Sequence, residues 1–234
     1  MSFNDRKGFS IIYIIRNGIR KVFSISEKLL FSRRKTTTPQ EIIKHIVSSL
    51  HQKHLKSMGF RKSGNTWIRS ENWTKVINIQ LSKWNTSSKA SFTVNLGVYI
   101  EPLHAISEEP PISGSLKEYH CDVRSRIGEL LPDKKDKWWD VTSGVSPETL
   151  AEEVFEDISQ YGLPWLDRMN NYMDVAYFFE EMDDHFMAAL SYYLSGNITQ
   201  AEISMTKAYA SATKHFMPKL QRIAAVNSIT IKGK

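Results

Sequence analysis

Five residues in the middle of the chain have side chains suited to binding a polar or charged ligand. A guanidinium group forms paired hydrogen bonds with carboxylates and phosphates, an amide offers a donor beside an acceptor, and an indole offers a stacking surface. The five residues are Gln80, Trp84, Asn95, Arg124 and Arg126. On one surface they could bind an anion, a partner bearing carboxylates, or a second copy of the chain. The alternative is that both arginines pair with acids of the same chain.

Three predicted β-strands would position these side chains. The stretch "INIQLSKWNTSSKASFTVNLGVY", residues 77–99, alternates apolar and polar residues on both sides of a loop, which predicts an antiparallel hairpin with one core face and one polar face. The polar face carries Asn, Gln, Ser and Thr with almost no charge. The stretch "EYHCDVRSRIGELLP", residues 118–132, alternates in the same way. If it joins the same sheet, Arg124 and Arg126 lie on the polar face.

The sequence "KDKWWDV" places Trp138 next to Trp139. Because adjacent side chains of a strand point to opposite faces, we expect one indole in the core and the other exposed. An exposed Trp beside arginines is typical of an interface hot spot.

A second group of candidate residues is acidic. Residues 147–185 hold eleven Asp/Glu and one Arg. The acids predicted to bind a partner are Glu152, Glu156, Glu180, Glu181, Asp183 and Asp184. Helical spacing puts most of them on the polar sides of amphipathic helices, which indicates either a solvated face or a docking face for a basic partner. Asp183 or Asp184 is also suited to cap the following helix.

The N-terminal arm is basic and amphipathic. Residues 1–35 hold nine Lys/Arg and two acids, and a helical wheel puts Ile12, Ile15, Ile19 and Val22 on one face. This pattern, between residues 8 and 35, suits an anionic membrane surface or an acidic protein patch. The alternative is a helix packed on the protein's own body, or a frayed tail. The uninterrupted apolar run is too short to span a bilayer, and no secretory signal is recognisable.

The remaining pattern is mostly helical. We expect a helix over residues 40–57, a proline-rich loop over 101–117, a helix from Ser146 to about residue 160 that is broken at 161–164, and a helical hairpin over 185–216. The predicted fold class is α+β, with an N-terminal helix, an antiparallel sheet and a C-terminal helical bundle packed on it. The predicted domains are the arm and linker (1–38), the α+β domain (39–168) and the helical extension (169–234).

Motifs of enzymes are missing from the sequence. It has no phosphate-binding glycine-rich loop, no G-x-S-x-G, no H-E-x-x-H and no C-x-x-C. His51 and His54 have helical spacing, but no Cys or carboxylate stands near them in sequence, so we predict no metal and no cofactor. The single cysteine, Cys121, excludes an intrachain disulfide and favours a reducing compartment. Enzymatic activity stays open, with a non-enzymatic role favoured.

Several blocks of the chain, in order, resemble the bacterial family catalogued as domain of unknown function DUF 4304. They are "MGFRKSGNTWIR", the hairpin sequence of residues 77–99, "CDVRSRIGELLPDKKDKWWDV" and "YGLPWLD". The resemblance covers about residues 42–168 and implies a bacterial, cytoplasmic α+β domain without a transferable activity. Residues 185–216 also resemble one tetratricopeptide-like helical hairpin.

Three functional hypotheses follow. The first is a non-enzymatic protein-interaction module, in its narrower form an immunity protein that neutralises a toxin with a basic domain. The second is a small-molecule or nucleotide-binding protein, or an enzyme, that uses the polar sheet face. The third is a peripheral membrane protein that uses residues 8–35. No specific nucleic-acid partner is predicted, because the positive charge is not gathered on one surface.

Overall fold

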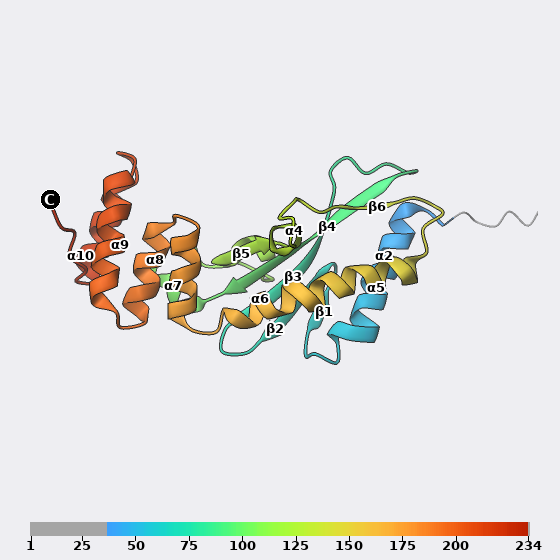
Figure 1. Cartoon of the computed structure of the whole chain (residues 1–234), viewed down its shortest axis with the longest axis horizontal. Helices are drawn as coiled ribbons and strands as arrows, with labels where there is room; N and C mark the ends of the chain where they lie inside the picture. The colour runs from blue at the N-terminus through green and yellow to red at the C-terminus, as the bar shows by residue number, and fades with distance from the viewer. Residues whose placement is uncertain (1–36, 234) are drawn as a thin grey trace, which may run out of the picture. The chain divides into compact units, whose positions relative to one another are not determined.

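The centre of the fold is a six-stranded antiparallel sheet in the order β1-β2-β3-β4-β5, with β6 also paired to β4. The computed structural model describes residues 37–233, and Figure 1 shows their arrangement. The strands are β1 (Arg61–Ser63), β2 (Thr66–Ser70), β3 (Thr74–Leu81), β4 (Ala90–Tyr99), β5 (Val123–Arg126) and β6 (Trp139–Val141). The predicted hairpin of residues 77–99 is confirmed as β3 and β4, whose register pairs Ile77 with Leu96.

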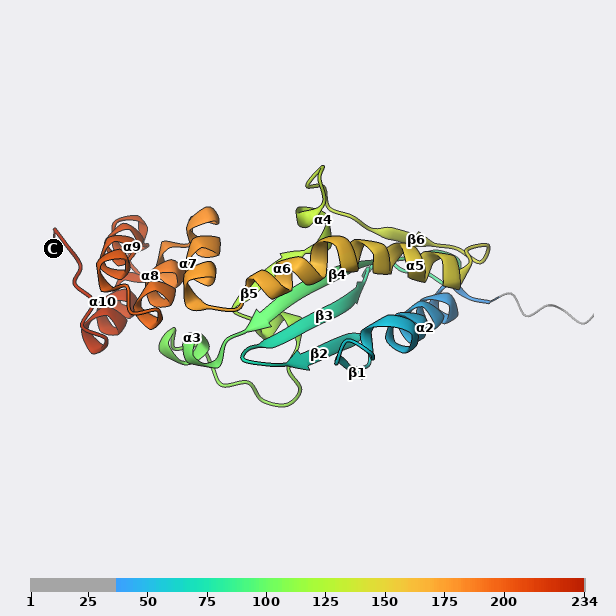
Figure 2. The ribbon, with the colours of Figure 1, turned by 60° about the horizontal axis from the view of Figure 1, so that its bottom comes forward.

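Two long helical segments cover one face of this sheet (Figures 1 and 2). The first is α2 (Pro39–Ser49), which continues into the π-helical turn η1 (Leu50–Leu55) and begins at a capping box between Thr38 and Glu41. The second begins with α5 (Pro147–Asp157), capped by Ser146. Between helices and sheet lie fully buried side chains such as Trp67, Phe92 and Leu96. This layer is the main core of the α+β part.

The second helical segment does not break where the sequence predicted. After α5 come the π-helical turn η3 (Ile158–Gly162) and α6 (Leu163–Arg168), and Gly162 keeps right-handed helical torsion angles, φ −70° and ψ −50°. In an α-helix the ring of Pro164 would clash with the carbonyl group four residues earlier. The wider π turn directly before it relieves this clash, so the chain stays helical. Gly162 also lets the turn lie close to the sheet, since a Cβ atom there would be 3.3 Å from a methyl group of Leu96.

The segment between β4 and β5 also differs from the prediction. The expected loop begins with a short helix, α3 (Glu101–Ile106), in which Pro102 stands in the first turn, a position that proline favours. The expected strand at 118–122 is instead a 3₁₀ turn, η2 (Glu118–His120), and β5 begins only at Val123. In this turn a side chain takes the place of a neighbouring strand as a backbone partner: the Lys117 N–H donates to the ring nitrogen Nδ1 of His120.

The C-terminal part consists of four helices, each of which contacts the next: α7 (Tyr172–Glu181), α8 (His185–Leu194), α9 (Ile198–Ser211) and α10 (Met217–Val226). The hairpin predicted at 185–216 is confirmed as α8 and α9, joined at Gly196, whose φ is +82°. Helix α8 also contacts α3. Lys219 on α10 pairs with Glu109, which follows α3, at 3.1 Å. The α+β class with a C-terminal helical bundle is therefore confirmed.

The amphipathic pattern of residues 8–35 lies outside the described residues. Residues 38–233 belong to one compact unit, and the domain boundary predicted at residue 168 stays a prediction. Within residues 37–233, no helix combines the length and the apolar character that crossing a membrane requires.

Candidate functional site

The sheet face opposite the helices carries the predicted polar residues. Cross-strand partners in an antiparallel sheet point to the same face. Gln80 pairs with Thr93, Asn78 with Asn95, Asn95 with Arg126, and Gly97 with Arg124. The structure therefore brings Gln80, Asn95, Arg124 and Arg126 together on one surface, which we call the amide face (with Asn78 and Thr93).

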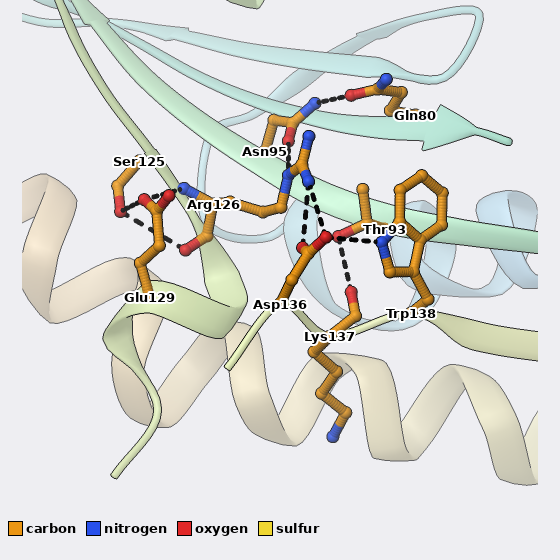
Figure 3. Close-up of polar contacts among 9 residues, drawn as sticks. All are labelled: Gln80, Thr93, Asn95, Ser125, Arg126, Glu129, Asp136, Lys137 and Trp138. Atoms are coloured by element: carbon orange, nitrogen blue, oxygen red, sulfur yellow. Dashed lines mark hydrogen bonds and ion pairs between the residues drawn. The ribbon is translucent and has the colours of Figure 1, made fainter. Parts of the chain in front are cut away.

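The amides of this face bond to one another across the strands (Figure 3). Asn95 lies at the centre and is only 6% exposed. Its Nδ2 donates to Gln80 Oε1 at 2.7 Å, and its Oδ1 accepts from Arg126 Nε at 3.3 Å. A carboxylate could not make the first bond and an ammonium group could not make the second. The uncharged character of the face therefore has a local cause, since an amide at this position satisfies both neighbours.

Arg126 is held in place by a carboxylate and an indole. Its Nη1 donates to both oxygens of Asp136 at 3.0 Å, and the guanidinium carbon lies 5.6 Å from the ring centre of Trp138. Trp138 Nε1 in turn donates to Asp136 Oδ2 at 2.8 Å. Although desolvation by burial raises it, the hydrogen bonds from Trp138 and Arg126 hold the pKa of Asp136 below its ordinary value. The three residues form one preorganised unit.

The predicted division of the tryptophan pair is confirmed. Trp138 is 37% exposed, whereas Trp139 is buried, stacks on Phe92 and donates to Glu153. One indole therefore belongs to the core and the other to the amide face.

Loops, not helices, cover the two ends of the amide face. At one end the Thr93 hydroxyl donates to the Lys137 carbonyl at 2.8 Å, so that the segment 131–138, which we call the covering segment, lies over β4. At the other end the side chain of Cys121 packs against Gly97. A Cβ atom at Gly97 would lie only 2.7 Å from the Cys121 Sγ. Burial raises the pKa of the Cys121 thiol, which fits a core residue and not a nucleophile.

A cavity of about 310 Å³ lies between these covers. It is lined by Asn95, Glu118, Arg124, Ser125, Arg126 and Glu129. Arg124 Nε donates to Glu118 at 2.7 Å, and Glu129 accepts from the Arg126 N–H and the Ser125 hydroxyl. Both arginines are thus paired with acids of the same chain. An incoming anion would compete with these carboxylates for the guanidinium groups.

Trp84 does not join this site. It lies in the loop between β3 and β4, outside the lining of the cavity, with 78% of its surface exposed.

The six predicted acids fall into two separate places. Glu152 and Glu156 lie on α5, whereas the other four lie at the end of α7 and the start of α8, and α6 separates the two groups in both views (Figures 1 and 2). Four of the six have partners in the chain: Glu152 pairs with Lys53 (3.0 Å), Glu180 with Lys207 (3.6 Å) and Glu181 with Arg168 (3.5 Å), and Asp184 accepts from the Met187 N–H as the cap of α8. Most of this acidic charge is therefore already compensated.

Asp136 is a member of the site that the sequence prediction missed. Its pairing with Arg126 runs through a loop that follows no periodic pattern. The bond from the Arg126 N–H to Glu129 could have been found, because an acid three residues after Arg126 has the spacing of a capping box. Among residues 37–233, no group of three His, Cys, Asp or Glu is arranged to hold a metal ion.

The family model described as Domain of unknown function (DUF4304) matches residues 50–168. The chain belongs to this family. The match spans the chain from η1 to the end of α6, so the amide face and its cavity lie inside the DUF4304 domain. Helices α7 to α10 lie outside the matched range. No curated protein and no solved structure matches the chain.

Proposed function

We propose that this DUF4304 protein is a non-enzymatic protein-interaction module that binds its partner through the amide face. The observation that carries the proposal is the unit of Arg126, Asp136 and Trp138, in which a half-exposed indole and a guanidinium group are already fixed. Trp and Arg are the residue types most enriched among interface hot spots. Since these side chains are already ordered, they would lose less conformational entropy when a partner binds.

The charges of the cavity favour a protein over a nucleotide or a small acid. Arg124 and Arg126 face three carboxylates, those of Glu118, Glu129 and Asp136. A phosphate there would meet a net negative environment, because each guanidinium is already neutralised. A protein surface can instead pack on Trp138 and hydrogen-bond to the exposed amide of Gln80 without breaking these pairs.

The narrower form of the proposal is an immunity protein whose partner is a toxin with a basic domain. Two of the predicted acids support a basic partner. The side chains of Glu156 and Asp183 are exposed and have neither a hydrogen bond nor an ion pair within residues 37–233. They would be available to lysines or arginines of the toxin.

Co-expression with the products of the neighbouring genes tests the proposal. We expect one of them to co-purify, and Trp138→Ala to weaken its binding at least tenfold, the scale of a hot-spot residue. Tyr119→Ala is the matched control, because Tyr119 is an exposed aromatic residue outside the amide face. A partner that binds wild type and Trp138→Ala equally would contradict the proposal. Thermal stabilisation by a nucleotide that disappears in Arg124→Ala would favour the small-molecule hypothesis.

A further inference from the structure

The loop between β3 and β4 presents the most exposed tryptophan that the structure describes. This loop, residues 82–89, is called the Trp84 loop. Trp84 is 78% exposed, and Leu81 at the end of β3 is 44% exposed. Leu81 pairs with Phe92, a core residue, so it points to the side of the sheet opposite the amide face. Two exposed apolar side chains therefore stand three residues apart at this end of the hairpin.

Hydrogen bonds hold the Trp84 loop in one conformation. Asn85 binds both backbone groups of Ser91, accepting from its N–H at 2.7 Å and donating to its carbonyl at 3.1 Å. Thr86 closes the turn by donating its N–H to the Lys89 carbonyl at 2.8 Å. The Trp84 N–H donates to the Ser82 hydroxyl at 3.2 Å. The indole is thus presented to solvent from a fixed backbone, although nothing in residues 37–233 covers it.

The charges around the indole suit a membrane surface. The Lys83 ammonium group lies 5.0 Å from the centre of the indole ring, and Lys89 lies farther along the same loop. Asp140 is the acid that faces this loop, 3.5 Å from Lys89. Tryptophan is favoured at the boundary between headgroups and acyl chains, because its ring is apolar and its N–H is polar. Lysines beside it can reach anionic headgroups while their stems stay on the apolar side.

The place where the basic arm joins the domain also favours a membrane. Gln40, in the first turn of α2, donates its side-chain amide to the Thr86 carbonyl. The polypeptide therefore enters the described domain beside the Trp84 loop. The residues that precede this point, 1–35, hold nine Lys/Arg and two acids. Stable binding to a membrane usually takes two weak signals, and an apolar loop plus a polybasic segment is such a pair.

We propose that the Trp84 loop is a membrane-contact site, at which Trp84 and Leu81 enter the headgroup region of a bilayer that contains anionic lipids. The basic arm supplies the electrostatic attraction and the loop supplies the apolar contact. This site is separate from the amide face, and the proposal stands whether or not that face binds a protein.

Sedimentation with lipid vesicles tests the proposal on the full chain. We expect pelleting with vesicles of phosphatidylcholine and phosphatidylserine, and much less with phosphatidylcholine alone. Trp84→Ala should lower the partition coefficient roughly tenfold, because burial of one large apolar side chain is lost. Tyr119→Ala, which removes an exposed aromatic side chain elsewhere, should bind like wild type. Equal pelleting of Trp84→Ala and wild type with the vesicles that contain phosphatidylserine would overturn the proposal.

A second set of variants separates the loop from the arm. Arg16→Glu, Arg20→Glu and Lys21→Glu together should remove the dependence on phosphatidylserine. Brominated lipids should quench the emission of wild type more than that of Trp84→Phe, because only a ring inside the bilayer is quenched. Equal quenching of the two would show that Trp84 stays outside the lipid. If Trp84→Ala instead abolishes binding of a protein partner and leaves vesicle binding intact, the loop is a protein contact and the membrane proposal is wrong.

Discussion

Asn95 shows how one residue explains the composition of a whole surface. It donates to Gln80 and accepts from Arg126 while it is nearly buried. Buried polar groups must be hydrogen-bonded, and only an amide can serve both partners here. The row of uncharged polar residues along β3 and β4 is therefore a hydrogen-bonded layer, part of which also faces solvent.

A contact between a histidine and a carboxyl group joins α3 to Asp122, the residue before β5. His104 Nε2 lies 3.0 Å from the Pro110 carbonyl oxygen, which can only accept, so this nitrogen carries a hydrogen. Its Nδ1 lies 3.1 Å from Asp122 Oδ1, and Asp122 Oδ2 accepts from the Ile100 N–H. The contact between Nδ1 and the carboxyl group is a hydrogen bond when the Asp122 carboxyl holds a proton. Without it, a lone pair would face a carboxylate.

This pair predicts a contribution to stability that is lost as pH rises through the raised pKa of Asp122, and that Asp122→Asn removes. Burial raises the pKa of Asp122, against the lowering effect of its bonds to Ile100 and His104. A raised folded-state pKa means that the folded protein holds the proton more tightly than the unfolded chain, so this contribution is lost as pH rises through the folded pKa. An Asn side chain makes the same two hydrogen bonds without a titrating proton. Urea unfolding over a pH series that starts in acid should show a smaller loss of stability with rising pH for Asp122→Asn than for wild type, and identical slopes would contradict the raised pKa of Asp122.

At the scale of elements, the covering segment depends on the absence of a side chain in α4 (Ile127–Leu130). A Cβ atom at Gly128 would lie 2.1 Å from the Lys135 carbonyl oxygen and 2.6 Å from the Lys137 nitrogen. Both are backbone atoms, so no side-chain rotation can relieve the clash. The carbonyl of the same Lys137 accepts the hydrogen bond from Thr93 that anchors the segment to β4.

Gly128→Ala should therefore displace the covering segment. We expect it to lower the free energy of unfolding by about 1–3 kcal/mol, as overpacking does, and to weaken partner binding through the movement of Trp138. Gly144→Ala is the control, since nothing lies within 4 Å of a Cβ atom there, and it should stay within about 0.5 kcal/mol of wild type. Urea unfolding of the two variants measures the difference; equal stabilities would show that the segment can move at no cost.

The accuracy of the sequence predictions differs between kinds of element. Alternation correctly placed β3, β4 and the polar phase of β5, because the period of two fixes which side chains share a face. The cap Ser146 was also correct, and of the two candidates Asp183 and Asp184 the second caps α8, since capping is a local interaction. The pairing of Arg126 with Asp136 and the π turn before Pro164 were missed. The first depends on the course of a loop and the second on how the helix accommodates a proline, and neither has a periodic pattern.

For the whole molecule, two carboxyl groups whose pKa values are shifted in opposite directions contribute to the dependence of stability on pH. Asp167 on α6 pairs with Lys75, whose side chain is 7% exposed, and with Arg69, both at 2.7 Å. Desolvation raises the pKa of Asp167, but these partners lower it further, to below the ordinary value. A lowered folded-state pKa gives stability above the unfolded pKa that is lost as pH falls through the folded pKa. The contribution of Asp167 is therefore lost as pH falls, whereas that of Asp122 is lost as pH rises.

Asp167→Asn should flatten the acid side of the stability profile alone. At neutral pH we expect a loss of about 1–2 kcal/mol, because Lys75 stays buried with Glu71 as its remaining partner, while the half-exposed position of Asp167 limits the effect. Thermal unfolding at several pH values measures both quantities. A parallel shift of the whole profile would mean that the lost stability comes from packing and not from titration.

The pairing of each arginine on the amide face has a kinetic consequence. A surface whose guanidinium groups are already neutralised exerts little long-range attraction, so a partner would find it by unsteered diffusion, with an association rate near 10⁵–10⁶ M⁻¹s⁻¹ that changes little with ionic strength. Tight binding would then have to come from slow dissociation. The arm, with nine cations against two acids, has the opposite property, since its attraction to an anionic surface weakens as salt is added. A salt titration of association rates would thus tell the two surfaces of one protein apart without any mutation.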